Sequence, residues 1–138
     1  MENTSDTLPR IQIKRKLESI MADDWKLKVV DQFKSGVKQE VQAWVVGLTE
    51  SFQPIQLNSK SLIATLTVDV VVFSEINETG VHHVISKLMD LTPSLFTDEI
   101  RINSINPVSS DTSYIDEASD GHVMASVTLE FSYYYKRN

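Results

Sequence analysis

The sequence predicts an α+β fold in which an antiparallel-dominated sheet carries two helices packed on one face. Three segments support this prediction. Apolar and polar residues alternate over 123–135 and again over 62–73, and a period of two is typical of strands with one buried face. Between these strands, apolar residues recur at helical spacing over 77–92, which predicts a helix that covers the sheet.

A first helix is predicted over 8–22, because apolar residues recur there at helical spacing. These residues are Ile13, Leu17, Ile20 and Met21. Thr7 is a candidate capping residue, and Pro9 suits the first turn. The segment 25–33 fits either a helix or a strand, and we favour a strand because it contains two adjacent valines.

A strand is predicted over 41–48, and a long polar connection over 49–61 joins it to the strand 62–73. Two strands joined by one connection usually pair in antiparallel fashion. This connection is longer than an ordinary hairpin loop, so we expect it to form a projecting arm.

The second helix, over 77–92, has Asn77 or Thr79 as its candidate cap and should stop before Pro93. Its expected buried stripe consists of Val81, Val84, Ile85, Leu88, Leu91 and Leu95. A strand over 99–108, a loop over 109–121 and the strand over 123–135 follow. The predicted order of elements is therefore α-β-β-β-α-β-β.

Length and charge limit the possible classes of protein. The 138 residues suit one domain over 1–138, and we expect 1–7 and 136–138 to be flexible. We expect neither a membrane span nor a secretory signal, because no apolar run is long enough. The net charge of −6 falls entirely on 51–138. An acidic surface repels nucleic acid, which argues against a DNA-binding domain but is compatible with DNA sliding past it.

The sequence contains no motif of an enzyme, a metal site or a cofactor site, so we expect none of the three. Cysteine is absent, which excludes disulfides and thiol chemistry. His82 and His83 are adjacent and have no further ligand at the i+3 or i+4 positions. We interpret them as part of a solvated helix face, with Glu78 near His82.

Three groups of residues are candidates for contact with partners. The polar connection and the outward side of the last strand form a candidate interface, since methionine and aromatic residues are enriched at interfaces. Its residues are Gln53, Pro54, Gln56, Asn58, Lys60, Met124 and Tyr134. The loop over 109–121 supplies candidate acidic residues for a DNA passage or a partner: Asp111, Asp116, Glu117 and Asp120. The basic run 14–16 is either a solvated helix face or a contact with an acidic partner.

In the order and texture of its elements, the chain resembles the tail terminator proteins of long-tailed bacteriophages. The resemblance covers about 8–135. It rests on the strand QAWVVGL, a long polar connection, SLIATLTVDVVVF, the helix VHHVISKLMDLTP, the strand EIRINSINPV, an acidic loop and the strand ASVTLEFSYYY.

The resemblance implies a structural virion protein that caps the tail tube as a homohexameric ring. Such a ring stops tube polymerisation and joins the tail to the head connector. The implied partners are further copies of the chain, the tail tube protein and a head–tail connector or adaptor, while DNA passes through without specific binding. The implied location is the neck of the virion, after synthesis in the host cytoplasm.

Two alternative functions remain open from the sequence. One is another neck or head-closure adaptor, which would bind the portal side. The other is a ligand-binding α+β domain with a concave apolar pocket between helix and sheet. A closed ring of six copies would favour the terminator over both.

Overall fold

The computed structural model describes residues 8–31, 41–57, 60–75, 77–96, 101–115 and 122–136. An α+β fold with a mostly antiparallel sheet is confirmed, and the elements follow the predicted order. These elements are α1 (Pro9–Ser19), the π-helical turn η2 (Ile20–Asp24), β1 (Lys28–Val29), β2 (Gln42–Pro54), β3 (Ser61–Ser74), α2 (Glu78–Met89), the 3₁₀ turn η3 (Pro93–Phe96), β4 (Ile102–Ile115) and β5 (His122–Lys136).

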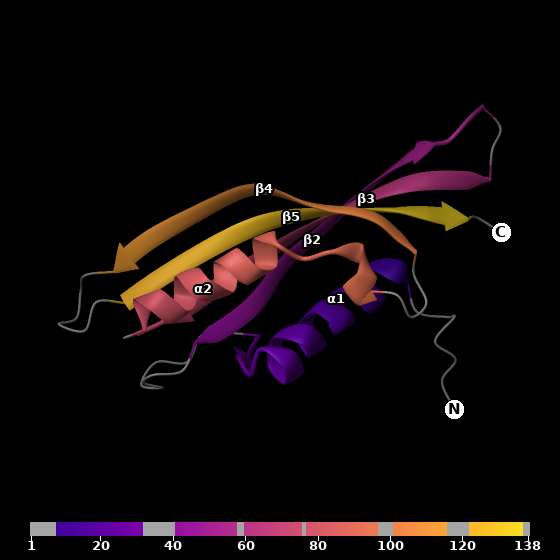
Figure 1. Ribbon diagram of the computed structural model, residues 1–138. Coiled ribbons are helices and arrows are strands. Elements are labelled where there is room, and N and C mark those ends of the chain that lie inside the picture. The colour runs from indigo at the N-terminus through magenta and orange to yellow at the C-terminus, as the bar shows by residue number, and fades with distance from the viewer. Residues whose placement is uncertain are drawn as a thin grey trace.

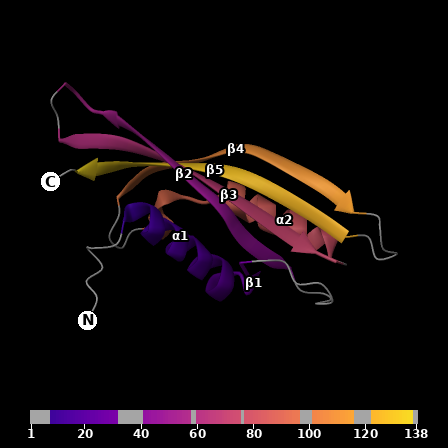
Figure 2. The same cartoon turned by 180° about the vertical axis from the view of Figure 1, so that it is seen from behind.

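The five strands form one sheet in the order β1-β2-β3-β5-β4. β3 is central and pairs with β2 on one side and β5 on the other, both antiparallel, while the short β1 runs parallel to β2. Figures 1 and 2 show α1 and α2 on the same side of this sheet. The sheet therefore has one face that the helices cover and one that no described element covers.

The core lies between the helices and the covered face of the sheet. Every second side chain of β3 and β5 points into it, as the alternation in the sequence predicts. The buried residues of these strands include Leu66, Val68, Val70, Val72, Ala125, Val127, Leu129 and Phe131. The expected stripe of α1 is buried, and so is that of α2 as far as Leu91. Leu95 is exposed, because η3 begins at Pro93 and breaks the helical phase.

Local sequence explains how α2 begins. The Asn77 side chain caps the helix, as predicted, by accepting a hydrogen bond from the Gly80 N–H at 2.9 Å. Gly80 allows this cap, since a Cβ at that position would lie 2.6 Å from the Asn77 side-chain nitrogen. At the other end, α2 stops at Met89, three residues before the predicted end.

The start of α1 differs in part from its prediction. Leu8 occupies the N-cap position and offers no capping side chain, while Pro9 lies in the first turn as predicted. Thr7, the expected cap, lies outside the described residues. After α1, the strand favoured over 25–33 is found only at Lys28–Val29, and the remainder of that segment from residue 32 is outside the described residues.

Two segments predicted as loops are largely strand. β2 continues through the expected connection as far as Pro54, because it pairs with β3 along this whole stretch. β4 likewise continues to Ile115, where the sequence predicted an acidic loop from residue 109, because it pairs with β5. In both cases a long partner strand supplies a hydrogen-bond ladder that local polarity does not reveal. Lys136, expected to be flexible, is the last residue of β5.

A hydrogen bond joins the beginning of α2 to the far end of β4. The Tyr114 hydroxyl donates to Glu78 Oε2 at 2.7 Å, and this hydrogen bond raises the pKa of Tyr114 above its usual value. Glu78 also lies 3.5 Å from His82 Nε2, which is the neighbour expected from the sequence.

We expect Val70→Asp to lower the free energy of unfolding by about 3 kcal/mol or more, because an unpaired carboxylate enters the dry core. Val70 is fully buried on the central strand. Thr65→Asp, on the uncovered face of the same strand, is the matched control and should cost less than about 1 kcal/mol. Urea denaturation measures both. Equal losses in the two variants would contradict the assignment of the two faces.

Candidate functional site

The uncovered face of the sheet carries a block of small polar side chains. Strand register places twelve residues of β2, β3, β5 and β4 in three adjacent rows on this face. The rows are Gly47, Asp69, Thr128 and Ser109; Thr49, Thr67, Glu130 and Asn106; and Ser51, Thr65, Ser132 and Ser104. Eight of the twelve are serine or threonine, two are carboxylates and none is basic. We call these residues the hydroxyl face.

One hydrogen bond holds the centre of the hydroxyl face. The Thr128 hydroxyl donates to Asp69 Oδ1 at 2.7 Å, across the β3–β5 pair. On the other side of Asp69, Gly47 leaves space for the carboxylate, since a Cβ there would lie 3.3 Å from Asp69 Oδ2. The carboxylate is thus held between two neighbouring strands, with its charge on the surface of the sheet.

The second feature is a projecting arm, which we define as residues 51–57 and 60–64: the end of β2, the start of β3 and the described residues between them. Figure 1 shows this hairpin extending beyond the helices, with the end of β5 alongside it. The arm exposes apolar side chains: Leu57 is 90% exposed, while Phe52 and Ile55 are each 44% exposed. The Phe52 ring contacts that of Tyr135 on β5, with centroids 5.7 Å apart. Its projecting end therefore offers apolar surface to a partner.

A partly buried polar cluster lies at the base of the arm. The Tyr133 hydroxyl, fully buried on β5, donates to Glu50 Oε2 on β2. Arg10 of α1 donates from its Nη1 to Glu50 Oε1 at 3.2 Å. One carboxylate therefore joins α1 to two strands at the point where the helices stop covering the sheet.

The structure brings several predicted interface residues together on the arm. Gln53, Pro54, Gln56 and Lys60 are all exposed there, and Asn58 is outside the described residues. Met124 and Tyr134 do lie on the same, uncovered face of β5. They do not form one patch, however, because ten residues of strand separate them by about 33 Å. Tyr134 is 56% exposed beside the arm, and Met124 is half-buried at the other end of the strand.

The predicted acidic loop is represented only by Asp111, which is an exposed strand residue of β4. Asp111 lies on the uncovered face of the sheet, which also carries the hydroxyl face, and it is opposite Ser126 of β5. Asp116, Glu117 and Asp120 are outside the described residues. Of the predicted acidic loop only Asp111 is therefore placed, and it joins Asp69 of β3 and Glu130 of β5 as a third carboxylate on the uncovered face.

Sequence reasoning missed the apolar residues of the arm and the role of Glu50. Phe52, Ile55 and Leu57 fall in a segment that was interpreted as a polar connection, although three apolar residues within six positions are evident in the sequence. Glu50 alternates in phase with Leu48 and Phe52, and this phase was the available signal that it points to the covered face.

In the parts of the chain that the structure describes, no three histidine, cysteine or acidic side chains are grouped so as to hold a metal ion. His82 and His83 are exposed on α2. Neither described helix is long and apolar enough to cross a membrane.

Comparison with known proteins adds no family assignment. A scan against models of known protein families found no match. A search of curated proteins found no similar sequence either.

We expect Glu50→Ala to destabilise the fold by about 2–3 kcal/mol, because it leaves the buried Tyr133 hydroxyl without its acceptor. Tyr133→Phe should cost about 1 kcal/mol, since the pair with Arg10 remains. Glu18→Ala is the control, because Glu18 also pairs with a basic residue, Lys14, but on the half-exposed surface of α1. Thermal unfolding of the three variants tests this, and an equal effect of Glu50→Ala and Glu18→Ala would refute it.

Proposed function

We propose that the protein is a structural component of a bacteriophage tail, which caps the end of the tail tube as a homohexameric ring and joins it to the head connector. The observation that carries the proposal is the two-sided sheet: helices bury one face, while the hydroxyl face is polar and acidic. A wall of this kind suits a passage for DNA, because carboxylates repel phosphates and offer no site at which DNA would stick.

The arm supports the assembly part of this proposal. Full burial of an exposed leucine or phenylalanine is worth about 1.5–3 kcal/mol, so docking of Phe52, Ile55 and Leu57 favours association. Lys60 is the one charged residue of the arm, so little desolvation of charge opposes burial of the arm. A closed ring requires head-to-tail contacts, and a projecting arm on one side of each subunit suits such a contact.

The resemblance to tail terminators in the order of elements also supports this proposal.

Two strand edges of the described sheet are open along most of their length. β4 is at one end of the sheet, and β2 beyond Ala43 has no described strand on its outer side. Open edges provide main-chain groups for contacts with a neighbouring subunit or with the tube.

The neck adaptor is the second candidate, because an apolar arm and an acidic face also suit a ring on the head side of the neck. The two proposals differ in the partner that the arm binds. A terminator binds tail tube ends, whereas an adaptor binds the portal.

The first experiment measures the solution mass of the purified protein by light scattering, followed by negative-stain imaging. We expect a ring of six copies, either free or on added tail tube ends. Binding to portal particles instead would replace the terminator by the adaptor. A protein that forms no ring and binds neither particle would refute both.

We expect the double change Ile55→Asp and Leu57→Asp to abolish ring formation or tube binding without changing the thermal stability of the subunit, because both side chains are exposed. Leu95→Asp is the matched control, since Leu95 has the same 44% exposure as Ile55 but lies outside the arm. Sedimentation velocity and a tube pull-down give the result. Normal assembly of the arm variant would show that the arm is not a contact.

A further inference from the structure

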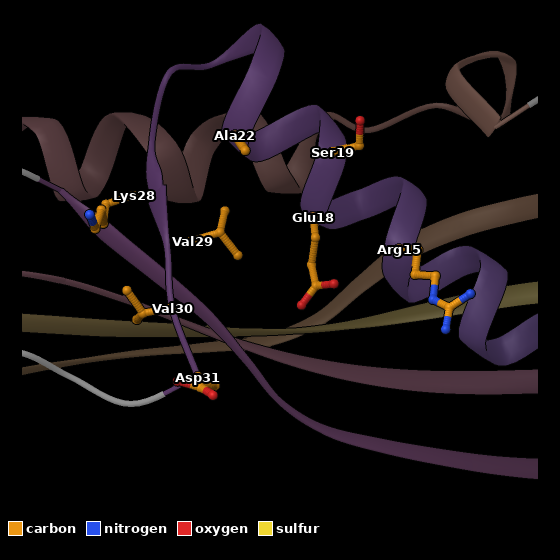
Figure 3. A pocket seen from close by; sticks show the side chains of 8 residues that line it. All are labelled: Arg15, Glu18, Ser19, Ala22, Lys28, Val29, Val30 and Asp31. Carbon is orange, nitrogen blue, oxygen red and sulfur yellow. The ribbon is translucent and has the colours of Figure 1, made fainter.

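A groove separates α1 from the strand segment that follows η2. It has a volume of about 640 Å³ and does not belong to the hydroxyl face or the arm. Figure 3 shows its two walls, one from the helix and one from the strand segment. The lining residues are Arg15, Glu18, Ser19 and Ala22 on the helical wall, and Lys28, Val29, Val30 and Asp31 on the strand wall.

The strand wall has a free main-chain edge. Lys28 and Val30 direct their N–H groups to β2, where they bond the carbonyls of Val41 at 3.2 Å and Ala43 at 2.9 Å. Because successive residues of a strand direct these groups to opposite sides, the N–H and C=O of Val29 point away from β2. Within the described part of the chain they make no hydrogen bond. Val29 therefore offers a donor and an acceptor to an added strand.

The free edge begins at Val29, because the preceding outward N–H is already bonded. The Leu27 N–H, which shares the outer side with Val29, already bonds the carbonyl of Met21 at 2.9 Å. An added strand would thus start alongside Val29 and run toward Asp31. In Figure 3 the Val29 side chain points toward the helical wall, where Ala22 and Glu18 lie. An edge strand beside a helix is an arrangement that accepts extended peptides, with main-chain bonds to the edge and alternate side chains in the groove.

Charge indicates which peptide fits. Glu18 is paired with Lys14 at 3.3 Å, so its charge is already compensated within α1. Arg15 and Lys28 are exposed, and neither has an ion pair among the described residues. They lie on opposite walls, and among the described residues that line the groove Asp31 is the one acid outside an ion pair. An occupant with carboxylates is therefore favoured over a basic one.

We propose that this groove binds an extended acidic segment of a partner protein as an additional strand on Val29. The segment places carboxylates near Arg15 and Lys28 and small apolar side chains against Val29 and Ala22. This interaction does not depend on ring formation. It also gives a role to the exposed Arg15 within the basic run 14–16.

The probes are two fluorescent seven-residue peptides with blocked ends, the acidic DVEVTVE and its basic counterpart KVKVTVK. Fluorescence anisotropy with the full-length protein measures their binding. We expect the acidic peptide to bind at least tenfold more tightly than the basic one, with an affinity that falls as salt is added. Equal binding of both peptides, or no binding of the acidic one at millimolar concentration, would overturn the proposal.

A proline substitution tests the strand geometry. Val29→Pro removes the outward N–H but keeps both hydrogen bonds to β2, because these come from Lys28 and Val30. We expect about tenfold weaker binding of the acidic peptide, in line with the loss of one main-chain bond. Val29→Ala keeps the N–H and is the control. Circular dichroism verifies the fold, and unchanged binding by a folded Val29→Pro protein would refute strand addition.

Charge reversal tests the recognition of carboxylates in a variant that leaves the main chain untouched. Arg15→Glu combined with Lys28→Glu should weaken binding of the acidic peptide at least tenfold. Lys136→Glu, at the end of β5 and outside the groove, has half the change in net charge and should bind normally. An equal loss in both proteins would mean that overall charge, and not the groove, attracts the peptide.

Discussion

The strict alternation of side chains along β3 is the constraint on which the rest of the structure depends. β3 pairs over its full length with β5 and over most of it with β2, so its two faces set the two faces of the whole sheet. A shift of register by one residue would turn Leu66, Val68 and Val70 to the uncovered face and carry Thr67 and Asp69 into the core. Helix packing, the hydroxyl face and the position of the arm all follow from this one register.

The two faces of the sheet and its projecting end differ in what they contribute to the protein. The covered face supplies stability, since α1 and α2 bury their apolar stripes on it. The uncovered face has no such burial and is free to carry hydroxyls and carboxylates. At one end the strands extend beyond the helices, and the arm there exposes Phe52 of β2 together with Ile55 and Leu57, which follow the end of β2. A passage wall and an assembly contact can thus come from a single sheet, which is why a ring is the proposed assembly.

Sequence alone predicted the elements whose signal is local, and it failed where distant partners decide. The stripe of α1, that of α2 as far as Leu91, one of the two candidate caps of α2 and the alternation of β3 and β5 all depend on near neighbours, and these predictions are confirmed. The extension of β2 to Pro54 and of β4 to Ile115 depends on strands far away in the chain, and polar composition concealed it. The hydroxyl face is visible in the sequence only in part: the alternation along β3 and β5 puts Thr65, Thr67, Asp69, Thr128 and Glu130 on one face. Its complete rows combine four strands and require the register. Glu50 shows the limit most clearly, because its partners Arg10 and Tyr133 are 40 and 83 residues away.

The strand order also bears on how the molecule folds. β2 ends at Pro54 and β3 begins at Ser61, so these consecutive strands can pair early as a local hairpin. β4 has no contact of this kind with β3, because β5 lies between them in the sheet. The β3–β5 pair joins residues that are far apart in the sequence. Ser74 pairs with Val123 at the end where this separation is smallest, and Ser61 pairs with Lys136 at the end where it is largest. Such a large sequence separation slows folding, since loop entropy is lost before the contacts form. Until β5 pairs with it, the central strand has one edge of unpaired main-chain groups beside an apolar face, and such an edge favours aggregation.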